Sequence, residues 1–395
     1  MRIIYIQDQE IYRFDGRIYH PKSRHYFTRY LSGLSIDERL IVICCIVDRN
    51  KEEIRKYQDV SNKNIVYESI PDFRKISSYF STRRIIKEKI QNSDFCYIRT
   101  GLSGIIAAYY CRRYHIPYMF VVNEDIENNL KTHKKMIVNK NANIIGKMTR
   151  YFISYADYAC YVTKEYLQKR YPCKGKTLGC SDIETLSINE ERLNNYIEKK
   201  RTSSDYVVGT IGPVNTKLKG QDVVINSIRK LKDKGINITY QLVGYGSGDW
   251  LKTLARELDV YENVQFLGEI SRDDVLLWMQ TLDFYIQPSK SEGLPRAIIE
   301  AMSCALPCIA ADVGGISELI PKEYLFDHNC NPVDKIVNII QNFDNEALIS
   351  MSRRNFQKAK EYDPLVLDKK RSEFFKCAIS DVRKEKEQET NDKVV

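Results

Sequence analysis

The hydrophobic residues of this chain fall into short runs of strand length that alternate with longer stretches of helical period. In the first half, the predicted strands are residues 2–7, 40–47, 65–69, 95–99, 118–122 and 158–162. The predicted helices between them include residues 81–91 and 102–114. Several strands are apolar on both faces, which is typical of a parallel sheet covered by helices on both sides. The first half is therefore predicted to form a doubly wound α/β domain.

A polar stretch without strand pattern, residues 181–205, interrupts this alternation and is interpreted as a capping helix followed by an interdomain linker. The alternation then restarts along the second half of the chain. The predicted strands are 206–211, 238–243, 264–267, 284–287 and 307–310, and the predicted helices are 221–232, 249–258, 275–280 and 296–304. We expect two doubly wound domains facing each other across a cleft, at residues 1–200 and 201–362, and a helix with a charged tail at 363–395.

Length and composition agree with this architecture. The chain has 395 residues, which favours two domains over one, and 43% of the residues are hydrophobic against 29% charged. That balance excludes a disordered chain and leaves ample apolar material for two cores. The longest apolar run, 40–47, is far shorter than the ~20 residues of a membrane-spanning helix. The first predicted strand is too short for the apolar core of a signal peptide, so we expect a cytoplasmic protein.

The eleven cysteines are interpreted as reduced, structural thiols rather than as a disulfide framework or a metal site. Cys44 and Cys45 lie inside an apolar run, as small buried residues do. Cys304 and Cys308 have a spacing compatible with zinc, but no second pair of cysteines or histidines accompanies them. We therefore expect no metal ion on the cysteines.

The net charge of the chain is +9, and this charge is unevenly distributed. No acidic residue occurs from position 128 to 156, and the basic residues there are Lys131, Lys134, Lys135, Lys140, Lys147 and Arg150. A second basic cluster consists of Arg74, Lys75, Arg83, Arg84, Lys87 and Lys89. Such clusters suit anionic lipid headgroups, nucleic acid or a substrate that carries a diphosphate, whereas a solvated surface is the simpler interpretation of either cluster alone.

The segment with the most chemical information, residues 287–302, is predicted to contain a strand end, a loop and a helix. Its loop amides and helix N-terminus are expected at the carboxyl end of a strand, where open α/β sheets bind ligands and where a diphosphate fits. Glu292 lies in the loop, and Glu300 lies among apolar helix residues. Because a buried charge needs a partner, Glu300 is expected to bind sugar hydroxyls such as those of a ribose, or else to form a salt bridge or face solvent.

The residues of this segment also form a pattern with others further along the chain. The pattern consists of Ser289, Glu292-Gly293-Leu294-Pro295, Glu300-Ala301-Met302, Pro307 and Gly314-Gly315 with Glu318. It resembles the donor-site signature of the family 4 glycosyltransferases. The resemblance covers residues 206 to about 362 and extends more loosely through the first domain. It implies a retaining enzyme of the GT-B type, with two Rossmann-like domains.

The resemblance also implies roles for other residues of the second domain. Gly212 and the pair Lys219-Gly220 resemble the segment whose lysine binds the donor diphosphate. Gly244 resembles the glycine of the turn that closes the next strand, and the backbone near Ile270 resembles the turn that reads the nucleotide base.

One position departs from the family pattern. The family usually has an arginine directly after the first glycine, and this chain has Pro213 there. Lys217 lies nearby and can supply the second charge on the diphosphate, although a lysine lacks the bidentate fork of an arginine.

In the first domain, residues 95–99 and 117–118 resemble capsule and O-antigen members of the family. Gly16 falls in the loop after the first predicted strand, where the family brings backbone close to the donor phosphates and the acceptor. Asp125 follows the predicted strand 118–122, where the family has a polar residue on the acceptor side, and His133 is the alternative.

The resemblance implies transfer of a sugar, with retention of configuration, from a UDP- or GDP-sugar. Glu300 is expected to hold the ribose hydroxyls, Lys219 to oppose the phosphate charge, and Glu292 to orient the transferred sugar. The amides of Gly293 and Leu294 are expected to stabilise the leaving diphosphate. The chain has no Asp-x-Asp motif, and neither a metal nor another cofactor is expected.

The acceptor and the location also follow from the resemblance. Polysaccharide-building members of the family act on glycans carried by polyprenyl diphosphate, which implies a lipid-linked acceptor and a peripheral position at the anionic inner face of the cell membrane. No aromatic-basic recognition motif indicates a nucleic-acid partner. Two other functions stay open, a nucleotide-sugar epimerase of the same fold and a non-catalytic, membrane-associated subunit with a degenerate donor site.

Overall fold

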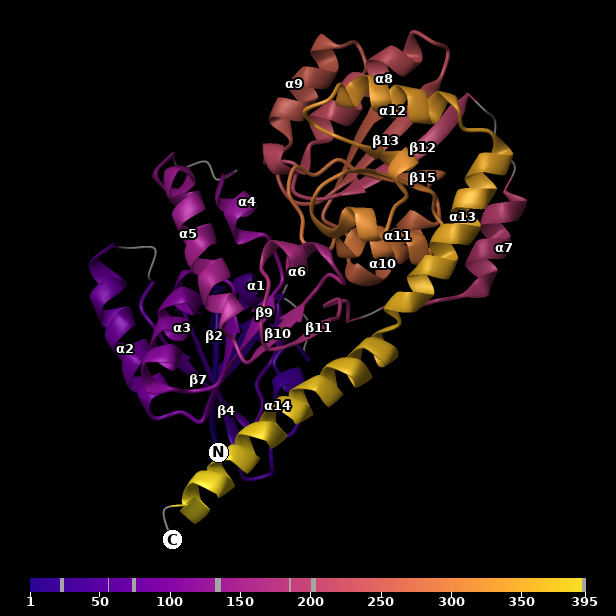
Figure 1. The fold of residues 1–395 in the computed structure, drawn as a ribbon. Helices are drawn as coiled ribbons and strands as arrows, with labels where there is room; N and C mark the ends of the chain where they lie inside the picture. Colours follow the sequence, from indigo (N-terminus) through magenta and orange to yellow (C-terminus); the bar gives the residue numbers. More distant parts are fainter. Residues whose placement is uncertain are drawn as a thin grey trace. The chain divides into compact units, whose positions relative to one another are not determined.

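A computed structural model of the chain describes residues 1–21, 25–55, 57–72, 76–131, 136–184, 186–199 and 204–392. The chain forms two compact units (Figure 1). Unit 1 consists of Met1–Glu184 with Leu365–Val395, and unit 2 consists of Thr185–Pro364. The sequence predicted a boundary near residue 200 and a separate C-terminal segment, whereas in the structure the second unit begins at Thr185 and the C-terminal segment packs within unit 1.

Unit 1 is built on a parallel sheet that contains seven strands among its described residues, in the order β11-β10-β9-β8-β1-β4-β7. The strands are β1 Arg2–Ile6, β4 Arg39–Cys44, β7 Ile65–Ser69, β8 Phe95–Arg99, β9 Tyr118–Val122, β10 Tyr158–Tyr161 and β11 Lys176–Gly179. The chain order reverses between β1 and β8, which makes this pair the switch point of a doubly wound sheet. The doubly wound α/β architecture predicted for the first half is confirmed.

A smaller mixed sheet in unit 1 was not predicted. It has the order β5-β2-β3-β6 and consists of β2 Ile11–Phe14, β3 Arg17–His20, β5 Ile46–Asp48 and β6 Gln58–Asp59. The predicted strand 40–47 is wrong as one element, because the chain leaves β4 at Cys45 and Ile46 pairs with Ile11 in the small sheet. Gly16 lies in the tight turn between β2 and β3, where Asp15 and Gly16 both have positive φ (47° and 70°) as a two-residue hairpin requires.

Helices cover both faces of the main sheet of unit 1 (Figure 1). Three of them pack side by side on one face, namely α2 Tyr79–Gln91, α3 Leu102–Tyr114 and α5 Met136–Ser154. On the other face lies α14, Pro364–Asp392. The ring centre of its Phe375 lies 5.5 Å from that of Tyr30 and 5.3 Å from that of Tyr97. The shorter helices of this unit are α1 Lys51–Ile54, α4 Ile126–Lys131 and α6 Tyr166–Arg170. In the described part of the chain, no helix is both long enough and apolar enough to span a membrane.

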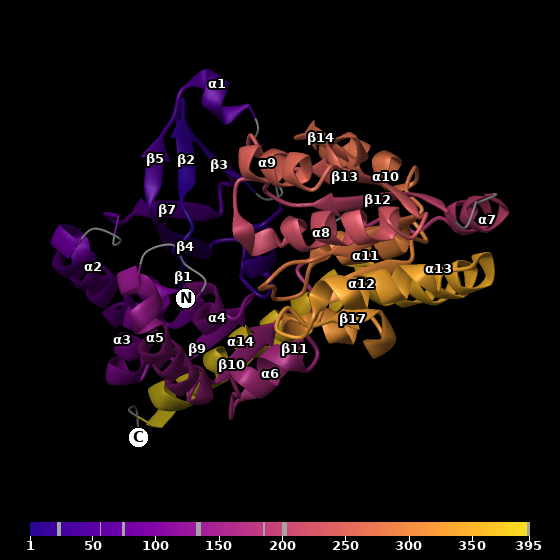
Figure 2. The same cartoon turned by 90° about the horizontal axis from the view of Figure 1, so that it is seen from above.

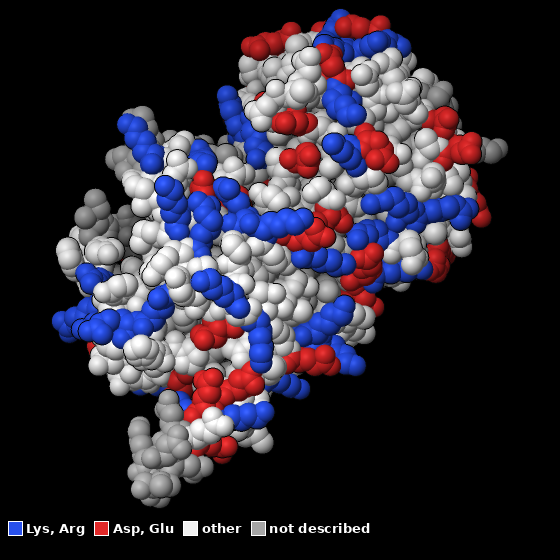
Figure 3. Space-filling model, in the orientation of Figure 1, with Lys and Arg blue, Asp and Glu red and all other residues white. Residues whose placement is uncertain are grey.

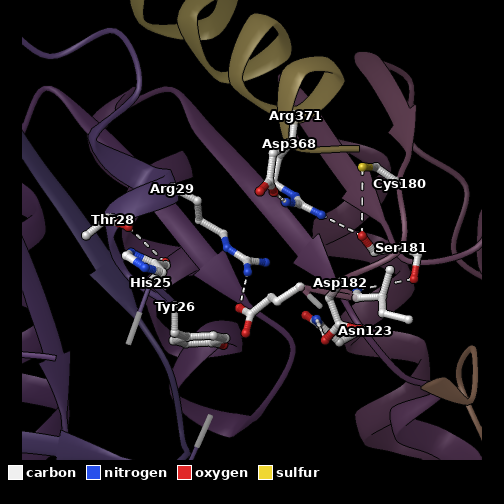
Figure 4. Close-up of polar contacts among 12 residues, drawn as sticks. His25, Tyr26, Thr28, Arg29, Asn123, Cys180, Ser181, Asp182, Asp368 and Arg371 are labelled. Atoms are coloured by element: carbon white, nitrogen blue, oxygen red, sulfur yellow. Dashed lines mark hydrogen bonds and ion pairs between the residues drawn. The ribbon is translucent and has the colours of Figure 1, made fainter. Parts of the chain in front are cut away.

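The last residues of unit 1 before the chain enters unit 2 are held by two arginines (Figure 4). Arg371 on α14 is buried and donates a hydrogen bond of 2.5 Å to the carbonyl of Ser181. Arg29 forms an ion pair with Glu184. Because both arginines belong to unit 1, they fix the end of this unit independently of unit 2.

Unit 2 is built on a second parallel sheet, with six strands among its described residues in the order β14-β13-β12-β15-β16-β17. The strands are β12 Asp205–Ile211, β13 Asn237–Val243, β14 Val264–Gly268, β15 Phe284–Gln287, β16 Cys308–Ala311 and β17 Leu325–Phe326. The helices are α7 Glu190–Glu198, α8 Gln221–Lys232, α9 Asp249–Glu257, α10 Arg272–Met279, α11 Arg296–Ser303, α12 Pro332–Gln341 and α13 Asn345–Ala359. Figures 1 and 2 show α8, α9 and α12 on one face of these strands and α10, α11 and α13 on the other. The second doubly wound domain is thus confirmed.

Candidate functional site

The candidate site lies in unit 2, where the strand order of its sheet reverses. The first strand, β12, pairs with β13 on one side and with β15 on the other, so that β12 and β15 form the switch point. At their carboxyl ends, Ile211 is followed by Gly212, and Gln287 is followed by the loop that leads into α11. A crevice outside the carboxyl ends of such a strand pair is where open α/β sheets bind ligands.

An ion pair between Lys219 and Glu292 occupies this position. The Lys219 Nζ lies 2.6 Å from Glu292 Oε1, and the two side chains are 26% and 15% exposed. Gln287 Nε2 donates a second hydrogen bond of 3.2 Å to the same carboxylate oxygen. The sequence analysis placed both charged residues in one site, and the structure brings them into direct contact.

A buried polar network behind the ion pair fixes Gln287. Tyr285 donates its hydroxyl to Gln287 Oε1 at 2.6 Å, and Gln287 Nε2 donates to the hydroxyl of the fully buried Ser289 at 2.8 Å. Burial raises the pKa of Tyr285, and the negative charges of Glu292 and Glu300 act in the same direction. Both carboxylates therefore lie within electrostatic range of one tyrosine at the end of β15.

Two glycines allow the loops of the site to approach each other closely. Gly220 has φ +67°, and a Cβ atom there would lie 1.9 Å from the carbonyl oxygen of Pro288. Gly314 has φ +62°, and a Cβ atom there would lie 2.1 Å from the carbonyl oxygen of Glu292. His328 supports the same loop with its Nε2 2.9 Å from the Pro288 carbonyl, a role that its sequence position did not indicate. Larger side chains at either glycine would displace the loop that carries Glu292.

The helix that follows this loop begins with a proline. Pro295 is the N-cap of α11, and its side chain makes no capping hydrogen bond. The carbonyl of Gly293 accepts a hydrogen bond of 2.6 Å from the amide of Gly315, which holds the loop in place. Leu294 is buried, with 7% of its surface exposed. The first amides of α11 thus lack the capping bond that a Ser, Thr, Asp or Asn at the N-cap would provide.

Three further predicted residues of unit 2 lie around the ends of the neighbouring strands. A Cβ atom on Gly244 would lie 2.2 Å from the carbonyl oxygen of Gly212, so these two turns touch at the same sheet edge. Ile270 lies between the end of β14 and Ser271, the N-cap of α10. Lys217 is exposed and has its ammonium 5.6 Å from the ring centre of Trp250, unlike Lys219, which contacts Glu292.

Asp125 of unit 1 lies in a different kind of environment. It is 2% exposed, and its Oδ1 accepts hydrogen bonds from the Tyr171 hydroxyl at 2.6 Å and from the Asn128 amide at 3.2 Å. Its Oδ2 accepts from the Tyr166 hydroxyl at 3.2 Å and lies 3.3 Å from Arg170 Nε. These partners hold Asp125 as a cap at the start of α4, and the alternative residue His133 lies outside the described residues.

Glu127 lies two residues after Asp125 and forms ion pairs with three cations. The sequence analysis did not single out this residue. Its carboxylate lies 2.6 Å from Lys131 Nζ, 2.6 Å from Arg150 NH1 and 3.0 Å from Arg170 NH2. Burial alone would raise the pKa of Glu127, but these hydrogen bonds and charges outweigh burial and lower the pKa to about 2. Two cations of the basic run at 128–156 are therefore neutralised locally, while Lys134 and Lys135 lie outside the described residues.

Comparisons with known proteins agree with the geometry of unit 2. Residues 194–361 match the family described as Glycosyl transferases group 1. Protein CapJ of Staphylococcus aureus is 29% identical to this chain over 340 residues, which cover 82% of each protein. The O-antigen biosynthesis glycosyltransferase WbnH of Escherichia coli is 28% identical over 188 residues, which cover 45% of this chain and 53% of WbnH.

A solved structure extends the likeness to the whole chain. Anabaena HepE, crystallised in complex with UDP-glucose, aligns with a TM-score of 0.61 and 17% identity over 95% of this chain and 99% of HepE. At that identity the likeness concerns the fold, which is that of two Rossmann-like domains. The chain therefore has the GT-B fold, and most of its second unit matches the Glycosyl transferases group 1 family.

Proposed function

We propose that this protein is a retaining glycosyltransferase that moves a sugar from a UDP- or GDP-sugar to a glycan acceptor during the biosynthesis of a cell-surface polysaccharide. The observation that carries the proposal is the contact between Lys219 and Glu292 at the switch point of unit 2. The part of WbnH in O-antigen biosynthesis supports a polysaccharide product, and the UDP-glucose bound to HepE supports a nucleotide-sugar donor.

In this proposal the donor diphosphate replaces Glu292 as the partner of Lys219. The lysine opposes the phosphate charge, and the amides of Gly293 and Leu294 with the uncapped start of α11 stabilise the leaving diphosphate as its charge grows. Glu292 is then free to accept hydrogen bonds from the hydroxyls of the transferred sugar. The chain's own groups thus carry the charge, and we propose transfer without a metal ion or other cofactor.

The remaining residues of unit 2 hold the nucleotide. Glu300 accepts hydrogen bonds from the ribose hydroxyls, and the backbone near Ile270 contacts the base. The turns at Gly212 and Gly244, which touch each other, bring backbone close to the phosphates. Ser289 keeps Gln287 oriented behind the site, and the exposed Lys217 has an auxiliary role at most, because it lies over Trp250.

Unit 1 provides the acceptor side. We propose that the acceptor hydroxyl attacks on the face from which the diphosphate leaves, and that a phosphate oxygen takes the acceptor's proton. Asp125 acts here as a positioning residue, because its oxygens accept hydrogen bonds from Tyr171, Tyr166 and the Asn128 amide of α4. The hairpin turn at Gly16 is proposed to bring backbone close to the substrates.

The acceptor is proposed to be a glycan linked to polyprenyl diphosphate. Such an acceptor is anchored in the membrane, so the enzyme is proposed to work in the cytoplasm, peripherally bound at the anionic inner face of the membrane. The excess of positive charge, +9, agrees with that surface. No nucleic acid partner is proposed.

A thermal-shift titration with UDP, GDP and their common sugar conjugates tests the donor assignment. A ligand that binds only the native state raises the unfolding midpoint, and we expect one nucleotide series to do so. Lys219→Ala should abolish most of the shift, with Lys217→Ala as the matched control. If no nucleotide raises the midpoint of the wild-type protein, the proposed donor site is wrong. The anomeric configuration of the product, read by NMR, tests retention separately.

A further inference from the structure

The outward face of α5 in unit 1 carries large apolar side chains that the fold does not bury. Ile144, Met148 and Tyr151 are 58%, 42% and 49% exposed, and Tyr155, directly after the helix end, is 46% exposed. Spacings of four, three and four residues place these side chains in one line along the helix, which we call the α5 stripe. Single exposed apolar residues are ordinary, but four in register along one helix face are not.

Packing within unit 1 does not explain the α5 stripe, because the opposite face of α5 already does the packing. Ala142, Thr149, Phe152 and Ile153 are buried there. Gly146 lies on the same inner side, where a Cβ atom would lie 2.5 Å from Glu127 Oε2. The helix is thus apolar on two sides, with one side against the unit and the other against solvent.

Positive charges lie beside the α5 stripe, although Asp381 and Glu385 of α14 line a pocket together with Tyr155. Lys140 and Lys147 are exposed on α5 itself, and the residues of this helix include no Asp or Glu. From neighbouring segments, the Arg112 guanidinium lies 3.9 Å from the ring centre of Tyr155, and the Lys174 ammonium lies 4.8 Å from it. Figure 3 shows blue side chains interspersed with uncharged ones over the part of the surface that α5 forms.

We propose that the α5 stripe docks on an anionic lipid bilayer, with α5 lying in the plane of the membrane interface. Ile144 and Met148 enter the boundary between headgroups and acyl chains, and Tyr151 and Tyr155 lie at headgroup depth. The surrounding lysines and Arg112 reach lipid phosphates while their aliphatic stems cover apolar surface. This inference rests on the proposed function, because it names the surface by which the enzyme would reach a lipid-linked acceptor.

The charges of the patch favour a bilayer over a second copy of the chain. A partner for this surface must tolerate several cations without any acid from α5, and two chains with a net charge of +9 each repel one another. Lys131 and Arg150 are not part of the proposed membrane contact, because both already pair with Glu127.

Co-sedimentation of the full chain with phosphatidylcholine vesicles, with and without phosphatidylglycerol, tests the proposal. We expect binding to the anionic vesicles and a partition constant about ten-fold lower for Ile144→Ser combined with Met148→Ser, which is about 1.4 kcal/mol. The matched control combines Leu277→Ser with Leu365→Ser, two residues that are 64% and 81% exposed elsewhere in the chain, and should change binding less than about two-fold.

A second measurement reports insertion directly. Tyr151→Trp should show fluorescence quenching by brominated lipid beyond the level of the two native tryptophans, which both lie in unit 2. Lys140→Gln with Lys147→Gln should weaken binding by roughly five-fold per lysine at low salt. Equal sedimentation of the Ile144/Met148 variant and the wild type, or no binding of the wild type to either vesicle, would overturn the proposal.

Two further readouts separate the outcomes. If the Ile144/Met148 variant converts a dimer to a monomer in light scattering without lipid, the surface is an interface between copies, and the proposal is wrong. Nucleotide affinity, measured by calorimetry on the same variants, should not change. Nucleotide binding without vesicle binding refutes the α5 inference alone, whereas vesicle binding without any nucleotide binding refutes the proposed function.

Discussion

The two sheets of the protein have equivalent switch points, yet the acidic residue at each switch point has a different partner. In unit 1, Asp8 follows β1 and its carboxylate caps α3, accepting hydrogen bonds of 2.6 Å from the Leu102 amide and 3.0 Å from the Ser103 amide. In unit 2, α11 begins after Pro295, whose side chain makes no capping hydrogen bond, and Glu292 of the preceding loop contacts Lys219. One switch point therefore uses its carboxylate to cap a helix, and the other pairs its carboxylate with a lysine.

Local sequence explains how unit 1 closes its switch point. A Cβ atom on Gly101 would lie 2.3 Å from Asp8 Oδ2, so the missing side chain at this position admits the carboxylate. Burial raises the pKa of Asp8, and the hydrogen bonds from Ser103 and Leu102 act against that rise. Arg99, at the end of β8, donates to the neutral groups Gln9 Oε1 at 2.8 Å and the Tyr26 hydroxyl at 2.7 Å.

In unit 2 the loop that leads into α11 also carries a carboxylate, but this carboxylate has other partners. Glu292 contacts Lys219 and Gln287 instead of capping α11. The comparison teaches that in a doubly wound fold the placement of one acidic side chain decides whether the switch point carries a helix cap or an ion pair.

The largest expected effect of a substitution is at Lys219. Lys219→Ala removes the cation that opposes the leaving diphosphate, and we expect kcat/KM for the nucleotide-sugar to fall about 10²–10³-fold. Lys217→Ala, the matched control two residues away, should lower it by less than about three-fold, because Lys217 lies over Trp250. Steady-state kinetics that show the reverse order would mean that Lys217, and not Lys219, serves the phosphates.

The next largest effect tests whether the switch point of unit 2 binds a nucleotide. Glu300→Ala removes the proposed acceptor of the ribose hydroxyls and should weaken nucleotide binding by about 1–3 kcal/mol, measured by calorimetry. Glu346→Ala, an exposed glutamate on α13 of the same unit, is the control and should leave the affinity unchanged. Equal affinities of the Glu300 variant and the wild type would exclude Glu300 from the nucleotide site.

Most long elements of the fold could be predicted from the sequence because they are buried on both faces. The helix Gln221–Lys232 and the strand Phe284–Gln287 were predicted with the bounds that the structure has. The strands Ile11–Phe14 and Arg17–His20 were missed because they are short, mix polar and apolar residues, and depend on pairing with a strand more than thirty residues away. Such pairing leaves little local signal.

The candidate site shows the same limit. The loop and helix around Glu292 could be predicted from glycine, proline and charge within one segment. The contact of Lys219 with Glu292 spans 73 residues, and the cap from Asp8 to Ser103 spans 95. Long-range contacts of this kind depend on the strand order, which the sequence pattern did not specify. Glu127 escaped notice for the same reason, because its partner Arg150 comes from another helix.

A smaller effect tests the closed switch point of unit 1. Asp8→Ala leaves the first amides of α3 without their cap and should lower the free energy of unfolding by about 0.5–2 kcal/mol, measured by urea denaturation. Asp344→Ala removes the exposed cap of α13, where Ala347 donates at 2.7 Å, and serves as the matched control at the lower end of this range. Nucleotide affinity should be unchanged in both variants. A marked loss of nucleotide affinity in the Asp8 variant alone would show that the crevice of unit 1 also takes part in donor binding.

The smallest expected effect concerns Glu127 of unit 1 and the pH dependence of the free energy of unfolding. The pKa of Glu127 is lowered to about 2 from its ordinary value of 4.5, so the folded state binds fewer protons than the unfolded state between these values. The stabilisation from Glu127 is therefore complete above about pH 4.5 and is lost as the pH falls toward 2.

Glu127→Gln should have a free energy of unfolding about 1 kcal/mol below that of the wild type at pH 7, since the partners of Glu127 are partly exposed. This gap in the free energy of unfolding should narrow by pH 3. Urea denaturation at the two pH values measures this gap, and Glu165→Gln, which alters an exposed pair with Lys169, is the control. A gap of the same size at both pH values would mean that the cations around Glu127 do not lower its pKa, and that this part of unit 1 is held by packing instead.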